Sequence, residues 1–428
     1  MMSAVSNDLL DDLKWRGLIA QTTDEWALRE SLKKPITLYI GFDPTAPSIH
    51  VGNLVVLLVL RRFQLAGHNP IPLVGGATGL VGDPSGKNDE RTLNTTEVVE
   101  EWVSRIRMQL EKFLDFQTPN NPAKMANNLD WTAPLTAIDF LRDIGKHFSV
   151  NQMLSKDAVS SRLNRDGISY TEFSYQVLQA MDYLELYKRF NCTLQLGGSD
   201  QWGNITAGLD LIRRVEGGSA HALTIPLLTK ADGTKFGKTA GGAVWLDPAM
   251  TSPYAFFQYW LNSDDADVIN FTKVFSFKSR EEIEALASRH EENPGAREAH
   301  RELARELTSL VHSPEIAQRV EVAARALFGQ ADLTELDEAT LSSAIAELPK
   351  TSISASDEMP SWVDLLVATG VVDSKSAARR IVKESGAYLN NEKVQGEDFR
   401  LEKSHFLCGK YAILRKGKRD LAAVELLK

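Results

Sequence analysis

The sequence predicts an α/β protein whose first domain is built on a doubly wound parallel sheet. An apolar run at 36–40 (ITLYI) indicates a buried strand, an apolar pattern of helical period follows at 51–65, and a second apolar run stands at 71–74. A strand, a helix and a strand in about forty residues form a βαβ unit, which produces a parallel sheet with a right-handed crossover. Strand-like runs recur at 193–196 and 222–228, so we expect this domain to span residues 1–250.

The later chain predicts three further parts. Charged and apolar residues are mixed at helical spacing over 251–329, which indicates a helical domain. Residues 330–359 are rich in Ser, Thr, Ala and acidic residues, and are expected to form a weakly packed linker. Over 360–428, two helical patterns precede a strand and a turn, which predicts a small α+β domain.

Length and composition bound the class of protein. A chain of 428 residues is too long for one compact core, and 43% apolar with 25% charged residues is ordinary for a globular protein. The longest apolar run, at 54–60, is far shorter than a membrane span, and the acidic first residues do not resemble a secretory signal. We therefore expect a cytoplasmic protein. With only Cys192 and Cys408, neither a disulfide framework nor a cysteine-based metal site is expected.

The formal charge of −9 conceals an asymmetry along the chain. Residues 360–428 carry 13 lysine and arginine residues against 9 acidic ones, whereas the rest of the chain carries 35 against 48. A basic segment on an acidic body suggests a module that meets a polyanion. Drift in surface charge explains so mild an excess equally well, so charge alone leaves both interpretations open.

A first candidate site lies between the first predicted strand and its helix, at 48–53 (SIHVGN). This position is the carboxyl edge of a parallel sheet, where open α/β folds bind ligands, and the amides that begin a helix favour phosphate. Gly52 lets a nucleotide approach the backbone, and His50 can donate a hydrogen bond to a phosphate as its charge grows. Thr45 and Asp43 add polar groups at the same edge. A single histidine is nevertheless more often structural or merely exposed.

A second candidate site is the basic, glycine-containing segment at 230–239 (KADGTKFGKT). Lys235 and Lys238, three residues apart in such a loop, suit a mobile clamp on pyrophosphate. Taken alone, a basic loop is usually an exposed turn.

The two segments together carry a resemblance. His50–Asn53 resembles the HIGH signature of the class I aminoacyl-tRNA synthetases, and Lys235–Thr239 resembles their KMSKS loop, in the same order. Further segments look like the bacterial tyrosyl enzymes of this class: 39–45, 75–84, 173–175 and 197–204. The resemblance covers nearly the whole chain. It implies a Rossmann-like catalytic domain and, from Trp362 to about Tyr411, an S4-like RNA-binding domain.

The residues that would select tyrosine also make sense without the resemblance. Tyr175, Gln179 and Asp182 are spaced i, i+4, i+7, so a helix places them on one face. Leu178 lies at the edge of that face, so Asp182 is expected to be partly desolvated and to need a partner such as a substrate phenol hydroxyl. The competing interpretation is an ordinary amphipathic helix with a surface aspartate.

The resemblance implies a role for each matching residue. It makes His50, Lys235 and Lys238 stabilise the transition state, assisted by Thr45. Tyrosine would be bound by Tyr39, Asp83, Tyr175, Gln179, Asp182 and Gln201, with Asp182 and Tyr39 at the phenol and Tyr175, Gln179 and Asp83 at the α-ammonium. ATP would be bound by Asp43, Gly52, Asn53, Gly198, Asp200 and Lys238, with Gln201 near the adenylate and Lys87 and Arg91 closing over pyrophosphate. The expected tRNA phosphate contacts are Arg379, Arg380, Lys383, Arg415, Lys416, Lys418 and Arg419, each of which is otherwise explained as a solvated surface charge.

The implied reaction is that of a tyrosine–tRNA ligase. Tyrosine and ATP form tyrosyl-adenylate and pyrophosphate, and the tyrosyl group then passes to the terminal adenosine of tRNA(Tyr). Mg²⁺ is expected to accompany ATP, no tightly bound protein-ligated metal is expected, and family members are homodimers without membrane contact. Two departures from the family pattern stand out: Asn53 replaces a second histidine, and Phe236-Gly237 replaces Met-Ser.

Two rival functions remain open from the sequence. A tryptophanyl-tRNA synthetase carries the same two signatures, but Asp182 with Tyr39 and the C-terminal domain favour tyrosine. A non-catalytic RNA-binding descendant of a synthetase is the other rival, and the intact His50, Lys235 and Lys238 argue against it.

Overall fold

The computed structural model describes residues 9–85, 93–154, 159, 167–234, 236–239, 242–346, 348–355, 358–417 and 420–427. The chain divides into two compact units. The first comprises Met1–Asp247 and Ile269–Ser279, and the second comprises Pro248–Val268 and Arg280–Lys428. The division into four parts at residues 250, 329 and 359 stays a prediction.

The first unit is built on a six-stranded sheet in the order β1-β6-β5-β2-β3-β4. The strands are β1 (Gln21–Thr22), β2 (Thr37–Phe42), β3 (Asn69–Val74), β4 (Ala126–Asn127), β5 (Cys192–Gly198) and β6 (His221–Ile225). All neighbours pair in parallel except β1, which runs antiparallel to β6, so the predicted parallel α/β sheet is confirmed. The chain proceeds from β2 to β3 and β4 on one side, and from β5 to β6 on the other. The strand order therefore reverses between β2 and β5, which is where such sheets bind ligands.

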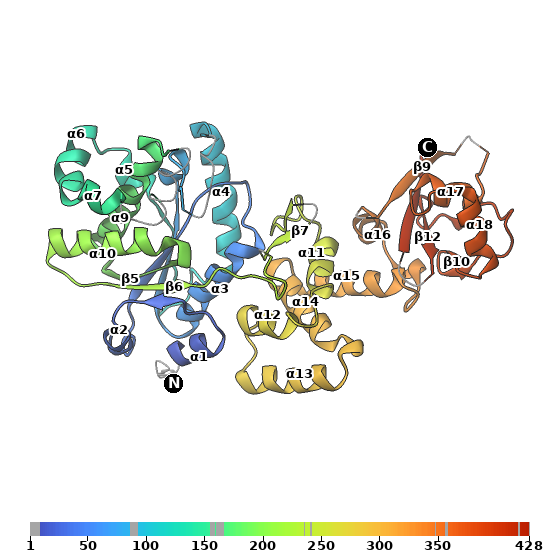
Figure 1. The fold of residues 1–428 in the computed structure, drawn as a ribbon, viewed down its shortest axis with the longest axis horizontal. Helices are drawn as coiled ribbons and strands as arrows, with labels where there is room; N and C mark the ends of the chain where they lie inside the picture. The colour runs from blue at the N-terminus through green and yellow to red at the C-terminus, as the bar shows by residue number, and fades with distance from the viewer. Residues whose placement is uncertain are drawn as a thin grey trace. The chain divides into compact units, whose positions relative to one another are not determined.

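Helices connect these strands and cover the sheet. They are α1 (Leu9–Trp15), α2 (Glu25–Ser31), α3 (Val51–Leu65), α4 (Thr96–Phe113), α5 (Leu129–Thr132), α6 (Ala137–Asp139), α7 (Val150–Leu154), α9 (Tyr170–Phe190) and α10 (Trp202–Glu216). Ser169 caps the start of α9 by accepting from the Glu172 amide, and α9 ends at Asn191 in the left-handed conformation. Figure 1 shows α10 running beside β5 and β6, which it contacts.

The second unit begins with helices and ends with a sheet. The helices are α11 (Pro253–Leu261), α13 (Arg280–Glu292), α14 (Glu298–Val311), α15 (Pro314–Leu327), α16 (Glu338–Ile345), α17 (Trp362–Ala368) and α18 (Lys375–Lys383), while α12 (Val268–Phe275) lies almost wholly in the first unit. The sheet has the order β11-β10-β12-β13-β9. Its strands are β9 (Lys350–Ser354), β10 (Ala387–Leu389), β11 (Glu392–Lys393), β12 (Tyr411–Lys416) and β13 (Asp420–Leu427).

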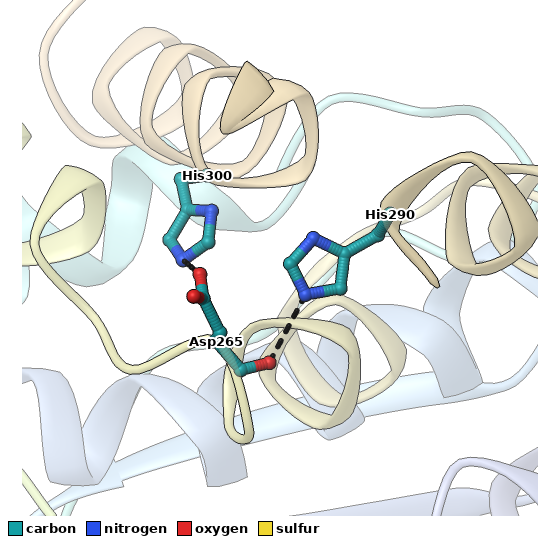
Figure 2. A group of neighbouring side chains, drawn as sticks. All are labelled: Asp265, His290 and His300. Atoms are coloured by element: carbon teal, nitrogen blue, oxygen red, sulfur yellow. Dashed lines mark hydrogen bonds and ion pairs between the residues drawn. The ribbon is translucent and has the colours of Figure 1, made fainter. Parts of the chain in front are cut away.

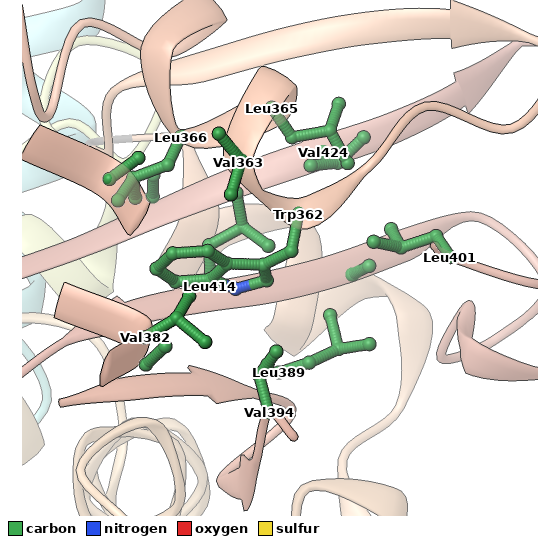
Figure 3. Close-up of a cluster of buried hydrophobic side chains, with 14 of the residues drawn as sticks. Trp362, Val363, Leu365, Leu366, Val382, Leu389, Val394, Leu401, Leu414 and Val424 are labelled. Atoms are coloured by element: carbon green, nitrogen blue, oxygen red, sulfur yellow. The ribbon is translucent and has the colours of Figure 1, made fainter. Parts of the chain in front are cut away.

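The core of this C-terminal sheet centres on Trp362, which is fully buried at the start of α17 (Figure 3). Its indole Nε1 donates to the Tyr388 carbonyl at 3.2 Å, so the one polar atom of the ring is satisfied. Leu366, Leu414 and Val424 pack in the same cluster, which joins α17 to β12 and β13. The predicted helices and strand are present, as α17, α18 and β10.

The segment at 330–359 was expected to be a weakly packed linker, but in the structure it contains a helix and a strand. Within it, α16 buries Leu341, Ala344 and Ile345, and β9 pairs in parallel with β13, Ile353 opposite Leu426. The spacing i, i+3, i+4 of the three buried residues is that of one helix face. The strand was concealed because its sequence, KTSIS, is mostly polar. Backbone pairing with β13 holds it in the sheet, and Ile353 alone of its five residues packs against the core as a partly buried apolar side chain.

No helix in the described part of the chain has the length and apolar character needed to cross a membrane.

Candidate active site

The predicted substrate residues of the first unit gather where the strand order reverses. Asp43 follows β2, Asp200 and Gln201 follow β5, and His50 immediately precedes α3. These positions are separated by up to about 160 residues in sequence, and the parallel sheet brings them to one edge.

His50 is the N-cap of α3, and its Nδ1 accepts a hydrogen bond from the Gly52 amide at 3.0 Å. Because Nδ1 accepts, the neutral ring carries its proton on Nε2, which makes Nε2 a donor. The positive end of the α3 helix dipole lies at this edge of the sheet, where it favours an anion. A Cβ on Gly52 would lie 2.8 Å from the His50 ring, so the absence of a side chain there preserves this geometry.

The lysine-containing loop lies against the first turn of α3. The Val51 amide donates to the Val244 carbonyl at 2.9 Å, and His50 and Trp245 form an isolated β-bridge. Gly237 has φ of +83°, and a Cβ there would lie 3.2 Å from Val51 Cγ2. The two signatures are therefore adjacent in space.

The replacement of Met-Ser by Phe236-Gly237 has a structural explanation. Phe236 is buried, with ring centroids 5.0 Å from Phe271 and 5.4 Å from Phe275, so it anchors the loop in an aromatic cluster. Gly237 supplies the positive φ that a serine disfavours. Lys235 lies outside the described residues. Lys238 begins the short strand β7 (Lys238–Thr239), paired with β8 (Gly242–Ala243), and only its backbone is described.

Asp182 is buried in the middle of α9, which confirms the predicted helix. Its Oδ2 accepts from Asn128 Nδ2 at 2.9 Å, and its Oδ1 accepts from Trp131 Nε1 at 2.8 Å. Burial raises the pKa of Asp182 to about 7, although these two hydrogen bonds act to lower it. Asn128 and Trp131 were not predicted, since nothing in the local sequence at 128–131 indicates a partner for residue 182.

Tyr39 of β2 is buried beside this network. Its ring lies 5.2 Å from the Tyr183 ring, and its hydroxyl has no hydrogen-bond partner among the described residues. Burial, and then the charge of Asp182, raise the pKa of Tyr39 well above its usual value, so the hydroxyl stays protonated. A buried hydroxyl without a partner is costly, so this position favours a polar ligand.

A second network surrounds Tyr175, which lies seven residues before Asp182 on α9. The Tyr175 hydroxyl donates to Asp43 Oδ2 at 2.6 Å, and Thr78 Oγ1 donates to Asp43 Oδ1 at 2.7 Å. Asn128 Nδ2 donates in turn to Thr78 Oγ1 at 2.9 Å, so this network is continuous with the Asp182 network.

Gln201 and Asp83 form a third contact of the crevice. Gln201 Nε2 donates to Asp83 Oδ2 at 2.7 Å, and the Ser85 amide donates to Asp83 Oδ1 at 2.9 Å.

Burial, and then the charges of Asp43 and Asp83, raise the pKa of Tyr175 well above its usual value. Several carboxylates around one buried phenol make the crevice acidic and suited to an ammonium group.

Two amide oxygens in this region are buried acceptors. Gln179 Oε1 on α9 and Gln195 Oε1 on β5 have no hydrogen-bond partner among the described residues. Acceptors of this kind are satisfied by a donor such as an ammonium group. Gln195 was not predicted, and the one available signal was a glutamine in the apolar run TLQLGG.

Three of the residues expected at the nucleotide or at its reacting phosphate are exposed. Thr45, Asn53 and Asp200 are exposed, and a Cβ on Gly198 would lie 2.5 Å from Asp200 Oδ1. Lys87 and Arg91 lie outside the described residues.

The cations expected to contact tRNA lie in the second unit, and several are paired with acids. Glu397 lies 3.6 Å from Arg379 and 3.1 Å from Lys383, while Arg380 pairs with Glu384 at 3.9 Å. The remaining described cations are engaged as follows: Lys416 with Asp420 at 3.0 Å, and the Arg415 guanidinium 3.9 Å from the Tyr388 ring centroid. Lys418 and Arg419 are outside the described residues.

Comparison with known proteins agrees with this geometry. Residues 30–329 match the family model of the class I tRNA synthetases (W and Y), so the chain belongs to this family. Residues 340–424 match the model of the tyrosine–tRNA ligase SYY-like C-terminal domain.

The relatives with high identity carry one name. The tyrosine–tRNA ligase of Streptomyces avermitilis is 60% identical over 422 residues, covering 98% of this chain and 99% of the relative. That of Acidothermus cellulolyticus is 56% identical over 421 residues, covering 97% and 99%. Among solved structures, a C-terminally truncated Aspergillus nidulans mitochondrial tyrosyl-tRNA synthetase is 30% identical with a TM-score of 0.69, covering 75% of this chain and 94% of that one.

Proposed function

We propose that this protein is a tyrosine–tRNA ligase that activates L-tyrosine with ATP and transfers it to tRNA(Tyr). The observation that carries the proposal is the buried pair of Asp182 and Tyr39, which lies in the same crevice as the His50 helix start. Relatives at 60% identity over nearly the full length bear the same name.

The amino acid is oriented by its two polar ends. Its phenol hydroxyl lies between Asp182 and the unpartnered hydroxyl of Tyr39, and its ammonium group lies among Tyr175, Gln179 and Asp83. Asp182 keeps its donors Asn128 and Trp131 with either amino acid. Phenylalanine would leave the buried Tyr39 hydroxyl without a partner and would donate no hydrogen bond to Asp182, whereas tyrosine supplies both contacts, which is the physical basis of selection.

In the first step the tyrosine carboxylate oxygen attacks the α-phosphorus of ATP. The bond from this phosphorus to the bridging oxygen breaks, and pyrophosphate leaves with the electron pair. Negative charge grows on the phosphate oxygens, where His50 Nε2–H, Lys235 and Lys238 stabilise it, with Thr45 assisting. Asp43, Gly52, Asn53, Gly198 and Asp200 hold the nucleotide, with Gln201 near the adenylate. Lys87 and Arg91 would close over the pyrophosphate, and Mg²⁺ would accompany ATP and offset phosphate charge.

In the second step a hydroxyl of the tRNA terminal adenosine attacks the tyrosyl carbonyl carbon, and AMP leaves. The S4-like C-terminal domain positions the tRNA through phosphate contacts of Arg379, Arg380, Lys383, Arg415, Lys416, Lys418 and Arg419. Its match to a C-terminal domain of tyrosine–tRNA ligases supports this assignment. The reaction takes place in the cytoplasm.

The test of this function is amino-acid-dependent ATP–pyrophosphate exchange with tyrosine, phenylalanine and tryptophan measured side by side. Exchange that depends on tyrosine supports the proposal. Exchange that depends on tryptophan instead identifies the sister enzyme, and exchange with none of the three favours a non-catalytic RNA-binding protein.

A homodimer is proposed as the working form. The segment between β4 and α9 exposes the large apolar residues Ile138, Leu141 and Val150, and Tyr170 is exposed at the start of α9. Such residues gathered in one inserted segment are typical of an interface. In sedimentation velocity, Ile138→Asp should shift the protein toward monomer. The control Glu292→Gln, which changes an exposed residue of α13, should not.

A further inference from the structure

A cluster of two histidines and one aspartate lies in the second unit, away from the residues assigned above. Asp265 stands in the loop between α11 and α12, His290 in the last turn of α13, and His300 in the first turn of α14 (Figure 2). One potential ligand atom from each residue lies within 4.8 Å of the other two. Three separate segments thus direct metal-binding side chains at one point.

Both histidine rings are buried, and part of their hydrogen-bonding capacity is unused among the described residues. His300 has no exposed surface and His290 is 8% exposed. His290 Nδ1 and both ring nitrogens of His300 have no hydrogen-bond partner among the described residues. Buried polar atoms are normally satisfied, so three in one cluster indicate a missing partner.

The hydrogen bond of His290 sets its tautomer. His290 Nε2 lies 3.1 Å from the Asp265 backbone carbonyl, which can only accept, so Nε2 carries the proton. Nδ1 is then left with its lone pair. A histidine that binds a metal through one nitrogen commonly donates from the other to a backbone carbonyl in this way.

The contact between His300 and Asp265 also fits a shared ion. His300 Nε2 lies 3.3 Å from Asp265 Oδ1, yet the pair lacks the alignment of a hydrogen bond. Two ligands about 2.0 Å from a tetrahedral ion lie roughly 3.3 Å apart.

Asp265 lies at the solvent-facing side of the cluster, and the cation of Arg297 lies beside its carboxylate. Its side chain is 54% exposed, so an ion can enter from that side. Arg297 Nη1 lies 3.6 Å from the same carboxylate oxygen. A bound ion would therefore compete with Arg297 for this oxygen.

We propose that Asp265, His290 and His300 form a site for a divalent transition-metal ion of the Zn²⁺ type, with water as the remaining ligand. Imidazole and carboxylate ligands in this number suit Zn²⁺. The ion joins the α11–α12 loop to α13 and α14 and stabilises this helical region. The site is independent of tyrosine activation, and it departs from the expectation of no protein-ligated metal.

The test uses the full-length, untagged protein, stripped with a chelator and titrated with Co²⁺ as a spectroscopic probe and with Zn²⁺. We expect the protein to bind one equivalent of Co²⁺ and to show the visible absorption of Co²⁺ in low-symmetry coordination. Zn²⁺ should displace the Co²⁺ and should raise the Tm. His290→Gln and Asp265→Asn should abolish both effects, and the neighbouring Asp264→Asn should retain both. Because Asp265 is exposed, Asp265→Asn keeps the fold if a histidine variant does not.

The proposal is overturned if the stripped protein shows neither the Co²⁺ band nor the Tm increase, or if Asp265→Asn and His290→Gln behave like Asp264→Asn. In that case the cluster is an ion-pair network of Asp265, Arg297 and His300 only. Pyrophosphate exchange, measured in parallel, reports separately on the proposed ligase function.

Discussion

The substrate crevice and the C-terminal domain use charged residues in opposite ways. In the crevice, Asp182 and Asp43 are buried or half-buried and accept hydrogen bonds from neutral donors such as Asn128, Trp131 and Tyr175. In the C-terminal domain, the cations lie at the surface and are balanced by acids such as Glu397. Removing one partner of a buried network leaves the other unsatisfied, whereas exposed ion pairs contribute little. Single substitutions should therefore have large effects in the crevice and small ones in the C-terminal domain.

The largest effect is expected for His50→Ala. It removes a donor to the growing phosphate charge, which should lower kcat for pyrophosphate exchange about 100–1000-fold. It also removes the N-cap of α3, which lowers the free energy of unfolding by about 1 kcal/mol. His50→Asn keeps an N-cap acceptor, so it should recover the stability without recovering the rate. Unchanged adenylate formation in His50→Ala would rule out the assigned role.

Asp182→Ala should come next, because it leaves Asn128 and Trp131 without their acceptor and removes the partner of the substrate phenol. Hydrogen bonds to charged groups contribute about 1.5–3 kcal/mol, so kcat/KM for tyrosine should fall roughly 10–150-fold. The preference for tyrosine over phenylalanine should shrink in the same exchange assay. A variant that keeps the full preference would show that Asp182 does not contact the phenol.

The raised pKa of Asp182, about 7, should appear in the pH dependence of stability. The native state keeps a proton that the unfolded state loses near pH 4, so the free energy of unfolding should fall as pH rises from about 4 to 7. The slope contributed by this group is at most about 1.4 kcal/mol per pH unit and disappears above pH 7. Urea unfolding of the wild type and Asp182→Asn from pH 5 to 8 should differ by this slope. Parallel curves would place the pKa of Asp182 near its ordinary value.

Tyr39→Phe should separate substrate binding from stability. The Tyr39 hydroxyl has no partner among the described residues, so its loss should not lower the free energy of unfolding, while KM for tyrosine should rise about 2–12-fold. Tyr183→Phe is the matched control, because that hydroxyl donates to the His221 carbonyl at 2.7 Å. It should lose about 1 kcal/mol of stability and leave KM unchanged. The reverse pattern would mean that Tyr39 is structural.

The smallest effect is expected for Glu397→Gln, which releases Arg379 and Lys383. If these cations contact tRNA phosphates, KM for tRNA should fall about 2–3-fold and its salt dependence should steepen. Pyrophosphate exchange should not change. The control Glu358→Gln releases Arg400, which is not among the predicted phosphate contacts. Equal behaviour of the two variants would remove the special role of Arg379 and Lys383.

Local patterns predicted much of this molecule. The βαβ unit at 36–74 and the helix that carries Tyr175, Gln179 and Asp182 are present, because apolar periodicity and spacing on a helix are properties of neighbouring residues. Strand β9 was not predicted, because it is held by backbone pairing with β13, more than 60 residues away. Asn128, Trp131 and Gln195 were not predicted either, since their importance depends on partners distant in the sequence.

The sequence by itself determined the class of fold, the two signatures and the residue types available for tyrosine and ATP, because these follow from composition and spacing along the chain. Only the tertiary structure decided which buried groups satisfy one another and which are left for a ligand. Each oxygen of Asp182 already accepts one hydrogen bond from the protein, whereas Tyr39, Gln179 and Gln195 each keep a polar atom without a partner among the described residues. The same distinction reveals the His290–His300 cluster. Hydrogen bonding between residues far apart in sequence depends on three-dimensional positions, which no local pattern records.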